Sequence, residues 1–372
     1  MDASEGPREP VDLDLHGLVG VRLVDPRPGD VRTVVRQLGL NPTRPSREPD
    51  LVLRFVDELP PDGTLRPLGA GAYAHDDSAF YAVVRGGQGS RRVRFGFGSL
   101  GLPGHELVCE HGVATVPLLL DVLNLTALQR GLLPLHASAF TRDGTGVLVT
   151  GWAKGGKTET LLGFMAEGAT HVGDEWVYLP GDGRMLGIPE PMRVWQWHLD
   201  DLPALRGRLS GRDRARLGTV QVAETALRRA GRGSGLVDRV ADAVGRQRFV
   251  HVRPQAFFDG ASTLTGRLDQ VFLTVTHDDP SVSVLPVAAA QVARRMTASL
   301  QLERSRLWEA YAHALFAFPD DRSPVLEGAG AREAELLARA LAGVPAHEVR
   351  HPYPVDIPAV VRAMTPFLLG SP

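Results

Sequence analysis

The feature that most constrains this chain is a glycine-rich loop at residues 151–158, which reads G-W-A-K-G-G-K-T. It fits the pattern G-x-x-x-x-G-K-[ST], in which successive backbone N–H groups face one phosphate anion. An apolar run of strand type, residues 146–150, precedes the loop, and a helix-compatible stretch, residues 159–166, follows it. Because strand, glycine loop and helix form the context that this pattern needs, the sequence predicts a phosphate-binding loop. The alternative is a glycine-rich turn that matches by chance.

Lysine usage marks the same loop. The chain has 41 Lys and Arg residues together, yet its only lysines are Lys154 and Lys157. This bias indicates that a compact ammonium group is needed here. Lys157 is expected to reach the β- and γ-phosphates, and the Thr158 hydroxyl to bind Mg²⁺, whereas Lys154 occupies a variable position of the pattern. The residues expected to contact the nucleotide are Gly151, Trp152, Ala153, Lys154, Gly155, Gly156, Lys157, Thr158 and Glu159.

Composition argues against several classes of protein. The formal net charge is −2, so no global attraction to nucleic acid or to an anionic membrane is expected. The longest apolar stretch, residues 113–140, contains Asp121, Arg130 and His136, which argues against a membrane span. A single cysteine, Cys109, excludes an intrachain disulfide framework. Together with an N-terminus that is unlike a signal peptide, it predicts a cytoplasmic location.

Two domains are expected. Residues 1–15 read as a loose tail, and short apolar runs separated by Gly and Pro then predict an antiparallel, mostly β N-terminal domain, residues 1–115. Residues 116–372 alternate strand and helix signals around the loop and are expected to form the second domain. In the first domain Asp76 and Asp77 resemble catalytic carboxylates, but a turn between strands explains them as well, and we favour the turn.

An arginine-rich, helical and polar insertion is expected at residues 202–248 of the second domain. It can form a patch for an acidic partner, or it can be the solvated face of an arginine-biased chain, and we favour the second interpretation. The arginines of this segment are Arg206, Arg208, Arg212, Arg214, Arg216, Arg228, Arg229 and Arg232.

Candidate catalytic residues flank the loop. His136 lies fifteen residues before Gly151 on an expected strand, and the pair Asp174 and Glu175 begins sixteen residues after Thr158. One helix and one strand bring that pair back to the sheet edge near the loop. There one carboxylate can hold Mg²⁺ while the other accepts a proton from an attacking hydroxyl. Thr158, Asp174 and Glu175 are therefore the expected metal ligands.

Residues 136–179 resemble HPr kinase/phosphorylase and its relatives, which are P-loop kinases related in core fold to phosphoenolpyruvate carboxykinase. That family carries G-x-S-G-x-G-K-S-E-T, then a helix ending in Gly, then V-A-D-D. Here G-K-T-E-T at residues 156–160, Gly168, and V-G-D-E at residues 172–175 match without a gap. His136 matches the family's histidine at the same spacing. The resemblance implies an α/β chain, α+β overall, with a phosphoenolpyruvate-carboxykinase-like P-loop kinase core behind a β-rich N-terminal domain.

The resemblance also implies a function. It predicts ATP- and Mg²⁺-dependent transfer of the γ-phosphoryl group to a hydroxyl of a small molecule, a peptide or a protein serine. It assigns catalytic roles to His136, Lys157, Asp174 and Glu175. Because Glu175 replaces the family's second aspartate, the division of roles between the two acids stays open. Relatives assemble as oligomers, so a homo-oligomer is possible and the oligomeric state stays open, whereas nucleic-acid and membrane partners are not expected.

The sequence departs from the family in other places. Trp152 and Ala153 replace a usual small or polar pair, and a second signature tied to phosphorylase activity is absent. The N-terminal domain does not resemble the regulatory domain of the HPr enzyme, so HPr is not expected as the substrate. The alternatives are a nucleotide-binding regulatory protein without turnover, a simple ATPase, and a peptide kinase whose arginine-rich segment holds an acidic peptide. Weaker candidates for ligand contacts are Arg193, Arg253, and one of Trp195 and Trp197 on an alternating strand.

Overall fold

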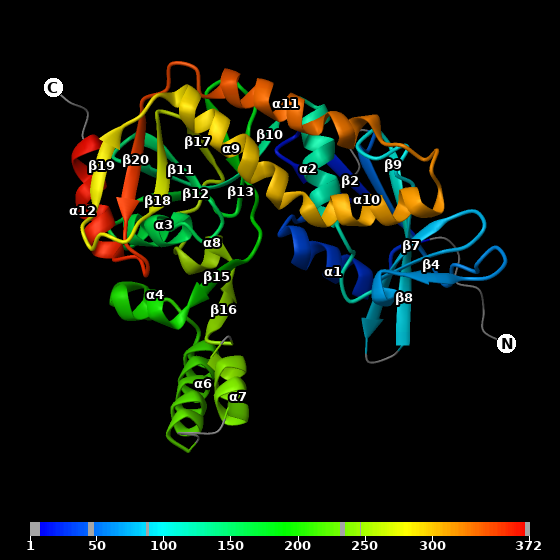
Figure 1. Ribbon diagram of the computed structural model, residues 1–372, viewed down its shortest axis with the longest axis horizontal. Helices are drawn as coiled ribbons and strands as arrows, with labels where there is room; N and C mark the ends of the chain where they lie inside the picture. Colours follow the sequence, from blue (N-terminus) through cyan, green and yellow to red (C-terminus); the bar gives the residue numbers. More distant parts are fainter. Residues whose placement is uncertain (1–7, 44–47, 87–88, 231–234, 246, 369–372) are drawn as a thin grey trace. The chain divides into compact units, whose positions relative to one another are not determined.

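Figure 1 shows the computed structural model of this 372-residue chain, which describes residues 8–43, 48–86, 89–230, 235–245 and 247–368. The described residues form a mixed α/β protein with two nine-stranded mixed sheets, a two-stranded ribbon and helices. The chain divides into two compact units, each assembled from three separate stretches. Unit 1 comprises Met1–His136, Trp176–Glu190 and Ala288–Val344, and unit 2 comprises Ala137–Glu175, Pro191–Val287 and Pro345–Pro372. The division into domains of residues 1–115 and 116–372 stays a prediction.

Unit 1 contains a nine-stranded sheet in the order β3-β1-β2-β4-β9-β8-β7-β6-β5. The pairings of β2 with β4 and of β4 with β9 are parallel, so the expectation of an antiparallel sheet is wrong at its centre. A parallel pair needs a long crossover connection, which helix α1 supplies between β2 and β4 and the strands β5 to β8 supply between β4 and β9. The elements of this unit are β1 (Val11–Leu15), β2 (Val19–Val24), α1 (Pro28–Leu38), β3 (Pro42–Thr43), β4 (Leu51–Val56), β5 (Arg66–Leu68), β6 (Tyr73–His75), β7 (Phe80–Gly86), β8 (Gly89–Phe95), β9 (His105–Glu110), α2 (Leu119–Gln129), β13 (Trp176–Leu179), β14 (Arg184–Gly187), α9 (Ala289–Glu303), α10 (Ser305–Ala317) and α11 (Pro324–Ala340).

Strand β1 corrects a second expectation, because residues 11–15 belong to the sheet and not to a loose tail. Its sequence V-D-L-D-L alternates, and the strand buries Leu13 and Leu15 in the core. Asp12 pairs with Arg22 on the neighbouring strand, with 2.8 Å between its carboxylate and the guanidinium Nε. Five alternating residues close to a chain terminus are a weak signal, which is why the sequence did not reveal this strand.

Unit 2 is built around strands in the order β12-β10-β11-β18-β20-β19. Strands β11, β18 and β20 are parallel, and β12 runs in the same direction because β12 and β11 are both antiparallel to β10. The carboxyl ends of these four strands therefore meet at one edge, where open α/β sheets place ligand sites. The elements are β10 (Leu133–Arg142, shared with unit 1), β11 (Thr145–Gly151), α3 (Lys157–Ala166), β12 (Thr170–Gly173), β15 (Met192–Trp195), α4 (Gln196–Asp201), α5 (Pro203–Arg206), α6 (Gly211–Ala230), α7 (Gly235–Gly245), β16 (Phe249–Val252), α8 (Pro254–Phe257), β17 (Thr265–Arg267), β18 (Gln270–Thr276), β19 (Ser283–Pro286), β20 (Ala346–His351) and α12 (Ile357–Leu368).

Helices α3 and α12 pack closely in the core of unit 2. Gly163 allows this approach, because a Cβ at that position would lie 2.5 Å from Cγ2 of Val361. Around this contact, side chains such as Val149, Leu161 and Val360 are fully buried. The burial holds the first turn of α3 against the sheet edge where β11 ends.

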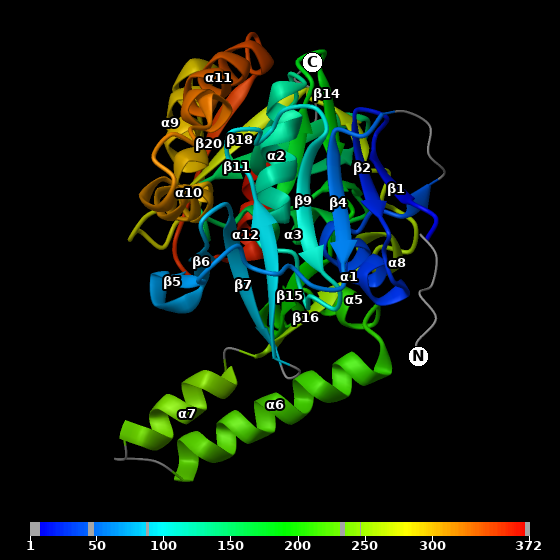
Figure 2. The same cartoon turned by 90° about the vertical axis from the view of Figure 1, so that its right-hand side faces the viewer.

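The arginine-rich segment contains α5, α6 and α7, and α6 and α7 lie side by side as a helical hairpin (Figures 1 and 2). Within α6 the buried side chain is Leu217. The hairpin interrupts a ribbon of β15 and β16, which buries apolar residues on one face and exposes Arg193 and His251 on the other. No helix in the described part of the chain combines the length and the apolar character needed to cross a membrane.

Candidate active site

The phosphate loop begins where β11 ends at Gly151 and leads into α3, which starts at Lys157. Gly156 has a φ of 90°, a left-handed conformation that favours glycine. A Cβ on Gly151 would lie 2.4 Å from Oγ1 of Thr274 on β18, so a larger residue there would displace the loop. Strand, loop and helix thus follow one another, and a helix start such as that of α3 presents backbone N–H groups suited to an anion.

The two lysines of the loop differ in their surroundings. Lys157 is buried, and its Nζ donates to the carbonyl oxygens of Trp152 at 2.9 Å and of Gly151 at 3.4 Å. Lys154 is exposed, as is the side chain of Trp152. Lys157 therefore belongs to the inside of the loop, whereas Lys154 lies on its rim.

Thr158 and Asp174 meet beside the loop, although sixteen residues separate them. The hydroxyl of Thr158, in the first turn of α3, lies 3.1 and 3.2 Å from the two carboxylate oxygens of Asp174, which follows β12. Ser138 on β10 donates to the same carboxylate at 2.6 Å. Ser138 was not a predicted site residue, and its position two places after His136 was the available signal.

This oxygen cluster fits a hard cation such as Mg²⁺, which prefers carboxylate and hydroxyl ligands and retains waters and substrate phosphates. Burial and the neighbouring Glu175 raise the pKa of Asp174 to about 7, although hydrogen bonds from Ser138 and Thr158 oppose the shift. A buried carboxylate of this kind would be stabilised by a nearby divalent cation. Among the described residues no group of three or more His, Cys, Asp or Glu could hold a metal ion, so phosphates and water would have to supply further ligands.

The other two candidates lie in different surroundings. Glu175 is exposed and has a φ of 61°, and its carbonyl accepts a hydrogen bond from the N–H of Ala137 at 3.1 Å. His136 belongs to unit 1, where its Nδ1 lies 2.5 Å from the Glu303 carboxylate and its ring centre 5.7 Å from that of Trp176. Contact between His136 and a bound phosphate therefore stays a prediction.

A buried histidine contacts the helix that follows the loop. His198 on α4 is 1% exposed, and its Nε2 lies 3.4 Å from the carboxylate of Glu159 on α3. The backbone N–H of Trp195 donates to Nδ1 of His198, so a neutral ring carries its proton on Nε2 and donates to Glu159. Burial opposes ionisation of Glu159, but this hydrogen bond lowers the pKa of the carboxyl below its usual value.

His351, at the end of β20, supports the loop from another side. Its Nε2 lies 3.0 Å from the carbonyl oxygen of Gly155 and its Nδ1 lies 2.9 Å from that of Pro352; because a carbonyl only accepts, the ring donates to Gly155 in the tautomer that carries its proton on Nε2. A Cβ on Gly156 would lie 2.8 Å from the same nitrogen. His351 is 1% exposed. No local sequence pattern indicates this contact, because 196 positions separate the two partners.

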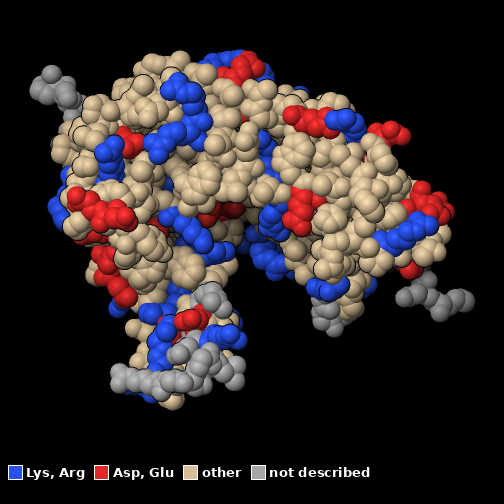
Figure 3. Space-filling model, viewed as in Figure 1, with Lys and Arg blue, Asp and Glu red and all other residues tan. Residues whose placement is uncertain are grey.

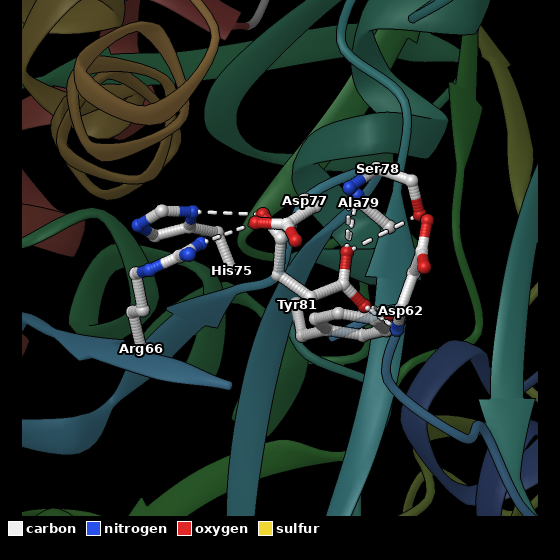
Figure 4. A network of polar contacts seen from close by, with 8 residues as sticks. Asp62, Arg66, His75, Asp77, Ser78, Ala79 and Tyr81 are labelled. Carbon is white, nitrogen blue, oxygen red and sulfur yellow. Dashed lines mark hydrogen bonds and ion pairs between the residues drawn. The ribbon is translucent and has the colours of Figure 1, made fainter. Parts of the chain in front are cut away.

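Asp76 and Asp77 occupy a turn, as expected. The Asp76 carboxylate accepts hydrogen bonds from the backbone N–H groups of Asp62, Ser78 and Ala79 and from the Tyr81 hydroxyl at 2.6–2.9 Å (Figure 4). Burial opposes its ionisation, but these donors hold the pKa of Asp76 well below its usual range. Asp77 is exposed and pairs with Arg66 at 2.7 Å. The network explains the two aspartates as a structural element of unit 1.

The tryptophan expectation is wrong in one respect. Trp195 ends β15, but Trp197 lies in α4, so the two do not alternate along a strand. The cause is local, because the chain turns into α4 directly after Trp195. Arg193 is exposed on β15, with its guanidinium 4.8 Å from the ring centre of Phe249. Arg253 is exposed directly after β16.

Several arginines of the insertion are paired with acids. Arg228 contacts Glu224 at 3.0 Å and Asp242 at 2.9 Å, Arg206 pairs with Asp200, and Arg208 lies 3.8 Å from Asp259. Figure 3 shows positive and negative side chains interspersed on the hairpin. These pairs agree with a solvated, mixed-charge face. Arg212, Arg214, Arg216 and Arg229 are exposed, and Arg232 lies outside the described residues.

Comparison with known proteins adds no family assignment. No protein-family model matches this chain, and no curated protein matches its sequence significantly.

Proposed function

We propose that this protein is a P-loop kinase similar to HPr kinase, with a core like that of phosphoenolpyruvate carboxykinase. It would transfer the γ-phosphoryl group of ATP, with Mg²⁺, to a hydroxyl of a small molecule, a peptide or a protein serine. The observation that carries the proposal is the contact of Thr158 with Asp174 beside the buried Lys157. A loop that only held phosphate would not need a buried carboxylate at its helix start. The proposal includes a cytoplasmic location and a homo-oligomer, without nucleic-acid or membrane partners.

The residues of the chain have separable tasks in this proposal. The loop amides and Lys157 bind and orient the β- and γ-phosphates, so the transferred group is held for in-line attack. When a nucleotide binds, the Nζ of Lys157 would donate to phosphate oxygens in place of the carbonyl oxygens of Gly151 and Trp152, which it now contacts on the inside of the loop. Thr158 and Asp174 would hold Mg²⁺, with Ser138 fixing the carboxylate through its hydrogen bond. When bound, the ion neutralises charge that develops on the phosphoryl oxygens.

The acceptor hydroxyl must lose a proton as it attacks. Asp174 is engaged by Thr158 and Ser138, whereas Glu175 is exposed at the same strand end. We therefore assign proton acceptance to Glu175 and metal binding chiefly to Asp174. His136, two residues before Ser138 on β10, is assigned to the transferred group on the basis of the family resemblance.

The first test is Lys157→Ala, measured as transfer of label from ATP to a panel of hydroxyl acceptors. We expect loss of transfer with a retained fold, because one compact charge at the phosphates is removed. Arg362→Ala is the control, since this cationic residue is exposed on α12 in the same unit. Turnover of Lys157→Ala at the wild-type rate would refute the proposed role of the loop.

The same assay separates the alternatives. ADP release without any phosphorylated acceptor would identify a simple ATPase. Nucleotide binding without ADP release across the panel would favour a regulatory protein. Release that depends on an added acceptor and on Mg²⁺, with the product mass increased by one phosphoryl group, is the outcome that we expect.

A further inference from the structure

An open pocket lies in unit 2 next to the phosphate loop. It encloses about 740 Å³, within the range of pockets that hold small ligands. Two aromatic residues from different elements line it, Trp197 of α4 and Tyr353 after β20. Their side chains are accessible, since Trp197 is 36% and Tyr353 75% exposed. Two carboxylates, Asp201 and Asp356, complete its polar lining.

Contacts on two sides connect this pocket to the loop. On one side Val355, a lining residue, would lie 3.3 Å from a Cβ built on Gly156. On the other side the ring centre of Trp197 lies 4.1 Å from that of His198, which contacts Glu159 in the first turn of α3. The pocket therefore adjoins the loop at Gly156, and His198 lies between its Trp197 side and Glu159, the residue that follows Thr158.

The strand order gives a bound nucleotide a direction. The loop follows β11, which lies between β10 and β18 in the sheet. Asp174 follows β12, which lies beyond β10, and the segment 353–358 follows β20, which lies beyond β18, so the two are on opposite sides of the loop. The carboxylate that would hold Mg²⁺ near the γ-phosphate is thus on one side of the loop. The pocket is on the other side, which leaves room there for the α-phosphate and the nucleoside of a nucleotide whose γ-phosphate lies near Asp174.

The charges of the pocket agree with that direction. Asp201 and Asp356 repel polyphosphate, and burial together with Asp356 raises the pKa of the Asp201 carboxyl. Carboxylates accept hydrogen bonds from base amino groups and ribose hydroxyls, and aromatic rings stack on bases. The uncharged end of a nucleotide fits such a lining, whereas its phosphates fit the loop.

We infer that the pocket between Trp197 and the segment 353–358 binds the base and ribose of the nucleotide whose phosphates the loop holds. Trp197 and Tyr353 supply stacking surfaces, and Asp201 and Asp356 accept hydrogen bonds from the nucleoside. The inference rests on the proposed function, because it concerns the other end of the same ligand. It predicts that this pocket, and not the loop, sets the preference among nucleotides.

The test compares Mg²⁺ complexes of ATP, GTP, UTP and inorganic tripolyphosphate by calorimetry on the full chain. In the wild type we expect one of the purine nucleotides to bind most tightly, because purines stack more strongly than uracil. Trp197→Ala should weaken that nucleotide about tenfold, a loss within the range measured for base stacking, and leave tripolyphosphate unchanged. Trp197→Phe should retain most of the affinity. Trp308→Ala is the control, because Trp308 is similarly exposed, at 38%, but lies in unit 1.

The outcomes separate this inference from the proposed function. Equal affinities for all three nucleotides, or equal losses for nucleotide and tripolyphosphate in Trp197→Ala, would overturn the pocket assignment. If tripolyphosphate fails to bind the wild type, the loop assignment fails instead, and the comparison among nucleotides still decides the pocket. Asp201→Asn provides a second variant, and we expect it to weaken the preferred nucleotide without affecting tripolyphosphate.

Discussion

At the scale of single residues, several polar side chains of this protein have surroundings that set their charge. Asp174 and Asp76 are both buried aspartates, yet their pKa values move in opposite directions. Asp174 receives two hydroxyl donors and lies beside Glu175, so burial and like charge dominate. Asp76 receives three backbone N–H groups and the Tyr81 hydroxyl, which stabilise the anion. The protein itself thus stabilises the anion of Asp76, a structural turn residue, whereas the anion of Asp174, the candidate metal ligand, would gain stability from a bound cation.

The Asp76 turn leads to a prediction about pH. Because its folded pKa is lowered, ionised Asp76 contributes stability above its unfolded pKa of about 4, and this contribution is lost as the pH falls. Asp76→Asn should lower the unfolding free energy by about 2 kcal/mol at neutral pH, the scale of hydrogen bonds to a charged group. The difference from wild type should shrink below about pH 4. Urea unfolding at a series of pH values measures this difference.

The exposed neighbour provides the control for that measurement. Asp77→Asn should change stability by less than about 0.5 kcal/mol, because the pair of Asp77 with Arg66 is at the surface. If the destabilisation by Asp76→Asn stays constant or grows as the pH falls, the ionised carboxylate of Asp76 is not the source of its contribution to stability.

At the scale of elements, the loop is held in place by elements that are distant in sequence. Strand β18 limits the space at Gly151, β20 supplies His351, and α4 supplies His198 to the helix of the loop. The lysine and threonine of the loop are local to one motif, but the residues that fix its backbone are not. We regard His351 as a positioning residue, because it acts on phosphate through the Gly155 carbonyl.

We predict that His351→Ala weakens ATP binding about tenfold, since a buried carbonyl loses its donor and the loop relaxes. His351→Gln should restore part of the affinity, because its amide can donate to the same carbonyl. His347→Ala is the matched control, because His347 lies in β20 like His351 but stacks on Phe272 of β18. A reduced melting temperature with an unchanged ATP affinity in His351→Ala would show that the histidine supports the strand only.

At the scale of the whole molecule, the elements whose signals lie in neighbouring residues of the sequence were predicted well. The strand and the helix around the loop were expected at residues 146–150 and 159–166, and they lie at Thr145–Gly151 and Lys157–Ala166, because an apolar run and a helix-compatible stretch flank the glycine pattern there. The parallel centre of the first sheet was not predicted, since strand pairing depends on contacts between distant segments.

The candidate site divides in the same way. The loop and Asp174 follow from a motif and its spacing, and the contact between Thr158 and Asp174 agrees with that spacing. His198, His351 and the pocket beside them were not predicted. They reach the loop only because α4 and β20 fold onto it, and neither residue lies in a pattern with its own chemical meaning.

The last prediction concerns residues 1–115 as a separate domain. Helix α2 begins four residues later, and its side chains from Val122 to Leu128 are buried. Gln37 exchanges two hydrogen bonds with the backbone of Val116, at 2.8 and 3.0 Å. Asp50 is fully buried and accepts a hydrogen bond from Arg130 at 2.7 Å. Contacts made by residues 1–115 therefore continue into the chain that a cut at residue 115 would leave.

We expect the chain 116–372 to unfold without a cooperative transition and to bind hydrophobic dyes, because the cut exposes apolar faces of α2. Differential scanning calorimetry and dye fluorescence on the truncated and full-length chains measure this. A single sharp transition, together with ATP affinity equal to that of the full-length chain, would contradict the prediction and establish residues 116–372 as an independent domain. If the truncated chain unfolds as expected, residues 1–115 are needed for the rest of the chain to fold. This agrees with the chain order, because the unit 1 stretches at 176–190 and 288–344 alternate with the stretches of unit 2.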